Sequence, residues 1–150
     1  MKDLNTDKTI IIGIGNYGRR DDGLGWRFLD LLEKSGYTHD MEYRYQLQIE
    51  DAQLISAYDN VIFVDACVNN MDTHYSFSTL EKEYSLSPIT HSISPGQLMF
   101  LCAELYGSCP EANVLAIRGY AFGLENGLSD EAEESLQAAY DGIKAILLRL

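Results

Sequence analysis

The chain has 150 residues, of which 46% are hydrophobic and 23% are charged, and its formal net charge is −12. This length and composition are typical of one water-soluble globular domain with a core of its own. The negative charge argues against nucleic acid and anionic membrane surfaces as partners, because binding to either depends on Lys and Arg side chains.

Two features of the sequence indicate the cellular compartment. No apolar stretch reaches the roughly 18–20 residues that a membrane-spanning helix needs, and residues 1–5 lack the apolar core of a signal peptide. The three cysteines, Cys67, Cys102 and Cys109, form no CxxC pair. Without an export signal they are expected to be reduced thiols. We therefore expect a cytoplasmic protein with no membrane segment.

Apolar patterns in the first half of the chain predict alternating strands and helices. A strand is expected over residues 8–14, a helix over 23–35, a second strand over 42–47 and a short helical patch near 51–57. Gly36 occupies the position after the first helix that favours a left-handed residue. The continuous apolar run 61–64 predicts a strand buried on both faces, and this run stops at Asp65.

The second half of the chain continues this alternation. Residues 75–79 alternate between apolar and polar side chains, which predicts a half-exposed strand at the edge of a sheet. Ser94, Pro95 and Gln97 together predict a helix start with a capping box. A short strand over 113–118 and a last helix capped by Ser129 follow. The pattern predicts an α/β fold, a single domain over residues 1–150 built as a three-layer α/β/α sandwich with a mostly parallel, twisted sheet.

A glycine-rich turn connects the first predicted strand to the first helix. It contains Gly13, Gly15 and Gly18 and ends in the adjacent acids Asp21 and Asp22. Turns of this kind are common ligand sites in α/β proteins, because backbone amides and a helix N-terminus meet there. Two aspartates give the turn the wrong charge for an anion, so we expect it to receive a cation or a polarised neutral group.

Three polar side chains are expected at the carboxyl ends of the strands, where open α/β sheets bind ligands. They are Asp22 after the first strand, Asp65 at the end of the 61–64 run, and His91 in the loop before the helix capped by Ser94. Two carboxylates and an imidazole suit a borderline divalent metal ion. Each also has a purely structural interpretation: Asp22 as an N-cap, Asp65 as a cap of the next loop, and His91 as an ordinary loop histidine.

Two other sites are compatible with the residues. Cys67 and His91 would be the members of a thiol protease dyad. The spacing of Gly13, Gly15 and Gly18 fits the G-x-G-x-x-G pattern of dinucleotide-binding folds. Against the dinucleotide, Asp21 and Asp22 would lie beside its pyrophosphate, and charged residues follow Gly18 where small and apolar ones are expected.

Four segments in order along the chain resemble the hydrogenase maturation proteases. Residues 12–16 and 21–25 resemble the family's strand, GxGN turn and acidic pair before a glycine, and residues 61–66 resemble its aliphatic strand ending in Asp-Ala. Residues 90–98 resemble its histidine before a Ser-Pro helix, and residues 127–129 resemble its Gly-Leu-Ser entry into the last helix.

The resemblance implies an endopeptidase that removes a C-terminal extension from the large-subunit precursor of a nickel–iron hydrogenase after nickel insertion. By motif, the family's metal-contacting acids and histidine correspond to Asp22, Asp65 and His91. They would contact the nickel of the precursor, and zinc or cadmium would take its place in the isolated protein. The alternatives are a nucleotide- or small-ligand-binding Rossmann-like module and a metal-binding maturation factor without peptidase activity.

Overall fold

The computed structural model describes residues 8–83 and 93–148. Within these residues no helix is both long and apolar enough to cross a bilayer. The regular elements, in chain order, are β1 (Thr9–Ile14), the 3₁₀ segment η1 (Tyr17–Gly23), α1 (Leu24–Lys34), β2 (Asp40–Arg44), α2 (Asp51–Ser56), β3 (Asn60–Cys67), β4 (Tyr75–Thr79), α3 (Pro95–Tyr106), β5 (Glu111–Arg118) and α4 (Asp130–Leu147).

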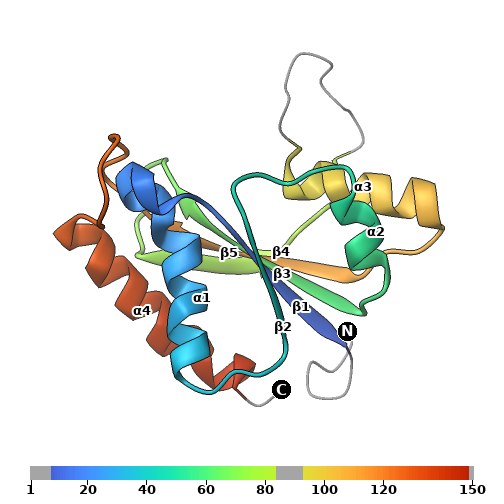
Figure 1. Ribbon diagram of the computed structural model, residues 1–150, viewed down its shortest axis with the longest axis horizontal. Helices are drawn as coiled ribbons and strands as arrows, with labels where there is room; N and C mark the ends of the chain where they lie inside the picture. Colours follow the sequence, from blue (N-terminus) through green and yellow to red (C-terminus); the bar gives the residue numbers. More distant parts are fainter. Residues whose placement is uncertain (1–7, 84–92, 149–150) are drawn as a thin grey trace.

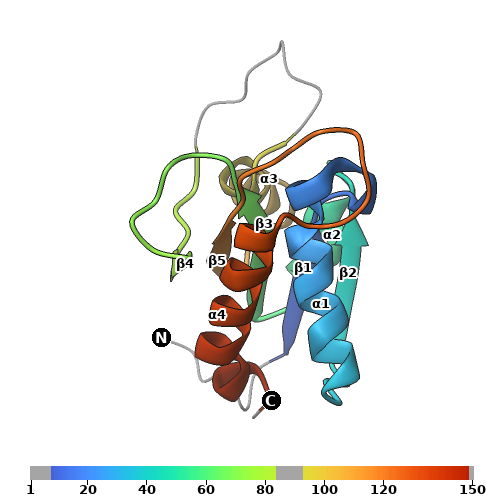
Figure 2. The same cartoon turned by 90° about the vertical axis from the view of Figure 1, so that its left-hand side faces the viewer.

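The strands form one sheet with the order β2-β1-β3-β5-β4. The first four strands in this order are mutually parallel, and β4 pairs antiparallel with β5 at one edge. Helices α1 and α4 cover one face of the sheet, and α2 and α3 cover the other (Figure 1, Figure 2). The predicted three-layer α/β/α architecture with a mostly parallel sheet is confirmed, and so is the edge strand over residues 75–79.

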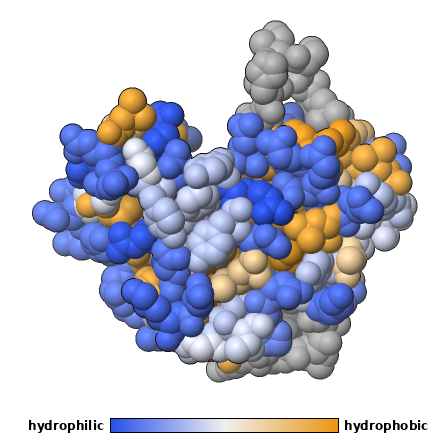
Figure 3. All heavy atoms as spheres, in the orientation of Figure 1, coloured by the Kyte–Doolittle hydropathy of each residue, from blue (hydrophilic) through white to orange (hydrophobic). Residues whose placement is uncertain are grey.

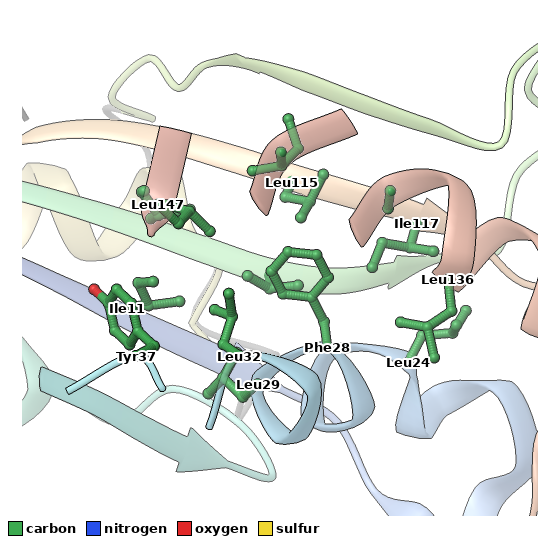
Figure 4. Packing of buried hydrophobic residues seen from close by; sticks show 14 of the residues in the cluster. Ile11, Leu24, Phe28, Leu29, Leu32, Tyr37, Leu115, Ile117, Leu136 and Leu147 are labelled. Carbon is green, nitrogen blue, oxygen red and sulfur yellow. The ribbon is translucent and has the colours of Figure 1, made fainter. Parts of the chain in front are cut away.

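Each face of the sheet has its own hydrophobic core, because the central strands are apolar on both sides. Ile11 and Ile62 belong to the core beneath α1 and α4, in which the Phe28 ring of α1 lies over the sheet (Figure 4). Ile10 and Phe63 belong to the core beneath α2 and α3. All five side chains are fully buried, and each contributes roughly 1.5–3 kcal/mol. The two cores thereby fix β1 and β3 next to each other.

Side-chain caps set the helix ends where the sequence predicts them. The Ser94 hydroxyl accepts a hydrogen bond from the Gln97 amide at 3.1 Å, and the Gln97 side chain accepts one from the Ser94 amide at 2.9 Å, which completes the capping box. Ser129 caps α4 by accepting from the Ala132 amide at 3.2 Å. Gly36 has a φ of 91°, the left-handed conformation expected after α1.

β5 starts two residues earlier than predicted, at Glu111, and three other segments differ more. β2 covers Asp40–Arg44 and not 42–47, because its pairing with β1 ends where β1 ends, at Ile14. β3 continues past the apolar run to Cys67, because β5 is long enough to pair with all of it. Asp65 therefore lies within a strand, opposite Ala116, and not after it. Residues 17–23, expected as part of the turn, form the 3₁₀ segment η1.

Candidate functional site

The candidate site lies where the strand order of the sheet reverses. From β1 the chain passes through α1 to β2 on one side, and then returns through α2 to β3 on the other side of β1. Helices on opposite faces leave an opening at the carboxyl ends of two such strands, where α/β proteins bind ligands. Asp22 follows β1 in η1, and Asp65 lies near the carboxyl end of β3.

Two glycines let the backbone close tightly around this point. A Cβ atom on Gly15 would overlap the carbonyl oxygen of Asp22, which accepts a hydrogen bond from the Asn16 amide at 3.1 Å. A Cβ atom on Gly25 would lie 2.5 Å from the carbonyl oxygen of Val64 on β3. Only glycine therefore allows the start of α1 to pack directly on the sheet. The turn places Asp22 beside the carboxyl ends of β1 and β3.

Asp21 is a structural residue, a role that the sequence interpretation missed. Its side chain is fully buried. The carboxylate accepts hydrogen bonds from the amides of Tyr120, Ala121 and Ser129 and from the Ser129 hydroxyl, at 2.7–2.8 Å. Burial opposes its ionisation, but these hydrogen bonds outweigh burial and lower the pKa of Asp21. Asp21 thus ties η1 to the loop of residues 119–129.

The preceding residue shows how firmly the two segments are joined. Arg20 has a φ of 52°, a left-handed conformation that is unfavourable for a residue with a side chain. Its amide donates to the carbonyl oxygen of Glu125 at 2.8 Å, and its guanidinium lies 3.3 Å from the Glu125 carboxylate. The Asp21 amide donates in turn to the Ala121 carbonyl at 2.9 Å. These contacts hold η1 in a strained shape that places the partly buried Asp22 at the site.

Asp22 and Asp65 interact electrostatically. The pKa of Asp65 is raised to about 7, chiefly by burial and to a lesser extent by the negative charge of Asp22, although a hydrogen bond from the Ala66 amide at 2.8 Å favours the ionised form. Burial also raises the pKa of Asp22, and the nearby charge of Arg19 partly offsets this effect. Two neighbouring carboxylates that resist ionisation create a site where a proton or a metal cation binds favourably. The structure thus brings two of the three predicted residues together.

The third predicted residue, His91, lies outside the described residues. The described chain resumes at Ile93, which forms an antiparallel bridge with Leu47 just beyond β2. Over residues 8–83 and 93–148 there is no group of three His, Cys, Asp or Glu side chains placed to hold a metal ion. The metal site composed of Asp22, Asp65 and His91 therefore stays a prediction. So does the Cys67–His91 dyad; the Cys67 thiol contacts the Asn69 carbonyl at 3.7 Å.

The structural alternative for Asp22 is wrong, because Gly23 is the N-cap of α1 and no side chain caps that helix. The turn is also poorly suited to a dinucleotide. The amides of residues 15, 16 and 18–21 all donate hydrogen bonds to other groups of the protein, so they are not available to a pyrophosphate. The helix begins at Leu24, well after the last glycine of the G-x-G-x-x-G pattern.

A surface depression of about 440 Å³ lies against Asp22. Figure 3 shows the molecule hollowed at this edge, between the part that contains α1 and α4 and the part that contains α2 and α3. The loops after four different strands contribute to the depression. The lining residues are Asn16, Arg19, Asp22, Tyr45, Val68 and Phe122.

The comparisons with known proteins agree on the fold. No protein-family profile matches the sequence, and no curated protein does. Among solved structures, the NiFe hydrogenase maturation protease HycI from Thermococcus kodakarensis KOD1 superposes with a TM-score of 0.73 at 21% identity, over 97% of this chain and 96% of that one. The hydrogenase maturating endopeptidase HybD from E. coli superposes with a TM-score of 0.65 at 21% identity, over 94% of this chain and 92% of that one. HybD from Thermococcus kodakarensis gives 0.65 at 17% identity, over 93% and 99%.

Proposed function

We propose that this chain, which has the fold of the hydrogenase maturation proteases, is an endopeptidase that removes a C-terminal extension from a nickel-loaded hydrogenase large-subunit precursor. The observation that carries the proposal is the pair of partly buried carboxylates, Asp22 and Asp65, at the switch point of that fold. Its support comes from three directions: the fold, the four sequence segments that resemble the family, and the chemistry of the pair.

In this proposal the nickel belongs to the substrate. Asp22, Asp65 and His91 contact the ion that the precursor already carries, and carboxylate and imidazole ligands suit such an ion. Binding of a divalent cation replaces the proton that Asp65 would otherwise retain near neutral pH. A precursor without nickel lacks this attraction. The enzyme therefore selects precursors into which the metal has been inserted.

Peptide hydrolysis requires a water molecule to lose a proton as it attacks the scissile carbonyl, and the departing amine to gain one. The nickel polarises that carbonyl or the attacking water. One of the two carboxylates accepts the proton from the water and then donates it to the departing amine, so the proton removed from the nucleophile ends on the leaving group.

The test is incubation with a nickel-loaded precursor, followed by measurement of the precursor mass. We expect the wild type to shorten the precursor, and Asp22→Ala, Asp65→Ala and the triple variant that also carries His91→Ala to leave it intact. Asp72→Ala is the matched control, because Asp72 is an exposed aspartate on the loop that follows β3. Full cleavage by the triple variant would exclude the proposal. Binding of the precursor by the wild type without any cleavage would favour a non-catalytic maturation factor.

A further inference from the structure

Exposed apolar side chains gather at the carboxyl edge of the sheet. Tyr45, Val68 and Leu124 are 70%, 69% and 81% exposed, and they lie on the loops that follow β2, β3 and β5. Tyr120 is also exposed, and Phe122 of the same loop lines the depression beside Asp22. Tyr45 and Val68 line the same depression, and Leu124 and Tyr120 lie on the loop that carries Phe122. Single exposed apolar residues are ordinary, but several on loops that line one polar depression are typical of an interaction site. We call these five residues the rim.

Packing from behind holds two of the rim's aromatic rings in place. The Tyr45 ring packs against Trp26 with 4.9 Å between ring centroids, and the Trp26 indole N–H donates to the carbonyl oxygens of Gly13 and Arg44. The Arg118 guanidinium lies 4.7 Å from the centre of the Tyr120 ring. Rings that are already ordered lose little conformational freedom when a ligand covers them. The rim is thus prepared for a partner.

Arg19 supplies hydrogen-bond donors inside the depression. The other described arginines are engaged: Arg20 with Glu125, Arg27 with Glu133, Arg44 with Glu42 and Asp51, and Arg118 with the Met71 carbonyl. Within residues 8–83 and 93–148, the Arg19 guanidinium forms no ion pair or hydrogen bond, and its charge acts on Asp22. Asn16 uses its side-chain oxygen to accept from the Gly18 amide, which leaves its NH₂ group as a donor.

The hydrogen-bond donors of Arg19 and Asn16 in the depression, together with the apolar side chains of the rim, match the chemistry of an extended peptide. In such a peptide, carbonyl acceptors alternate with side chains. A nucleic acid is disfavoured by the net charge of −12. We propose that the rim and the donors of Arg19 and Asn16 bind the residues around the scissile bond of the precursor in extended form. Apolar side chains of the precursor lie on the rim, and its backbone carbonyls accept from Arg19 and Asn16. This inference rests on the proposed function and adds a second determinant to it, independent of nickel.

The test measures KM and kcat for cleavage of the nickel-loaded precursor, together with fluorescence anisotropy of a labelled, nickel-free peptide spanning the cleavage site. We expect Tyr45→Ala combined with Leu124→Ser to raise KM and weaken peptide binding by about tenfold each, with a smaller effect on kcat. Arg19→Leu weakens peptide binding similarly, whereas Arg19→Gln retains most of it because Gln keeps N–H donors. The control pair Leu105→Ser and Tyr106→Ala, exposed on α3, leaves both measurements unchanged.

The two proposals fail in different ways. A wild type that never cleaves the nickel-loaded precursor contradicts the proposed function, whatever the peptide does. The rim inference alone is contradicted if the wild type cleaves the precursor and the rim variants have the same KM and peptide affinity as the control pair. Equal loss of peptide binding in Arg19→Leu and Arg19→Gln shows that the charge of Arg19 is needed. In that case Arg19 would bind a carboxylate of the precursor and not a backbone carbonyl, which overturns this part of the inference.

Discussion

Replacement of Asp65 by asparagine tests the electrostatic description of the site. The pKa of Asp65 is raised from 3.8 to about 7, chiefly by burial. The folded protein therefore holds this proton more tightly than the unfolded chain does. The resulting stabilisation is fully present below about pH 4 and is lost as the pH rises through 7. Asparagine has no proton to lose, so the variant escapes this loss.

The size of the effect follows from the shift. One pKa unit corresponds to about 1.36 kcal/mol, so ionisation of Asp65 lowers the free energy of unfolding by about 4 kcal/mol between pH 4 and pH 8. Roughly 2–3 kcal/mol of this loss falls between pH 5 and pH 8. We expect Asp65→Asn to be more stable than the wild type at pH 8. The difference in free energy of unfolding between variant and wild type should be roughly 2–3 kcal/mol larger at pH 8 than at pH 5. Urea unfolding followed by circular dichroism, with EDTA present, measures both gains.

The control for this experiment is Asp72→Asn on the exposed loop after β3, for which we expect a change within about 0.5 kcal/mol at either pH. The same Asp65→Asn protein should fail to process the nickel-loaded precursor, so stability rises while activity is lost. An Asp65→Asn gain that is the same at pH 5 and pH 8 would refute the assignment of a raised pKa to Asp65. A variant that is less stable than the wild type at pH 8 would do so as well.

Three further substitutions test how the site is held, each by urea unfolding. Gly15→Ala should cost at least about 2 kcal/mol, because its Cβ overlaps the Asp22 carbonyl, whereas Gly123→Ala, which meets no atom within 4 Å, should cost far less. Asp21→Ala should cost at least about 3 kcal/mol, since it leaves buried donors of residues 120–129 without a partner. Ser94→Ala should cost about 1 kcal/mol through loss of the α3 cap, and a change below 0.3 kcal/mol would contradict the capping interpretation.

Most of the fold was predictable from the sequence, because local signals and tertiary packing agree. The apolar run before Asp65 and the alternation over residues 75–79 correspond to a central and an edge strand of the observed sheet. The Ser94 and Ser129 caps start helices where expected. The errors occur where pairing decides the boundary. Cys67 belongs to β3 only because β5 provides a partner for it, and no pattern within residues 61–67 indicates that partner.

The site was predictable only in part. Asp22 and Asp65 could be selected because each follows an apolar run that predicts a buried strand, and the negative charge of Asp22 does act on Asp65. Nothing in the sequence distinguishes the role of Asp21 from that of Asp22. The adjacent pair was a usable signal, since a turn that exposes one of two neighbouring acids directs the other inward. What Asp21 contacts, however, depends on residues about 100 positions later in the chain.

The neighbouring residues Asp21 and Asp22 have opposite pKa shifts: the pKa of Asp21 is lowered and that of Asp22 is raised. This difference explains how the site keeps its shape. Asp22 and Asp65 repel each other in a partly buried position, which by itself favours any rearrangement that separates them. Asp21 opposes that rearrangement, because moving η1 would break four hydrogen bonds to a buried carboxylate. The left-handed conformation of Arg20 is maintained by the same attachment to residues 119–129. Protonation of Asp65 relieves this repulsion without moving the chain, and in the proposed function the cation of the precursor would do the same.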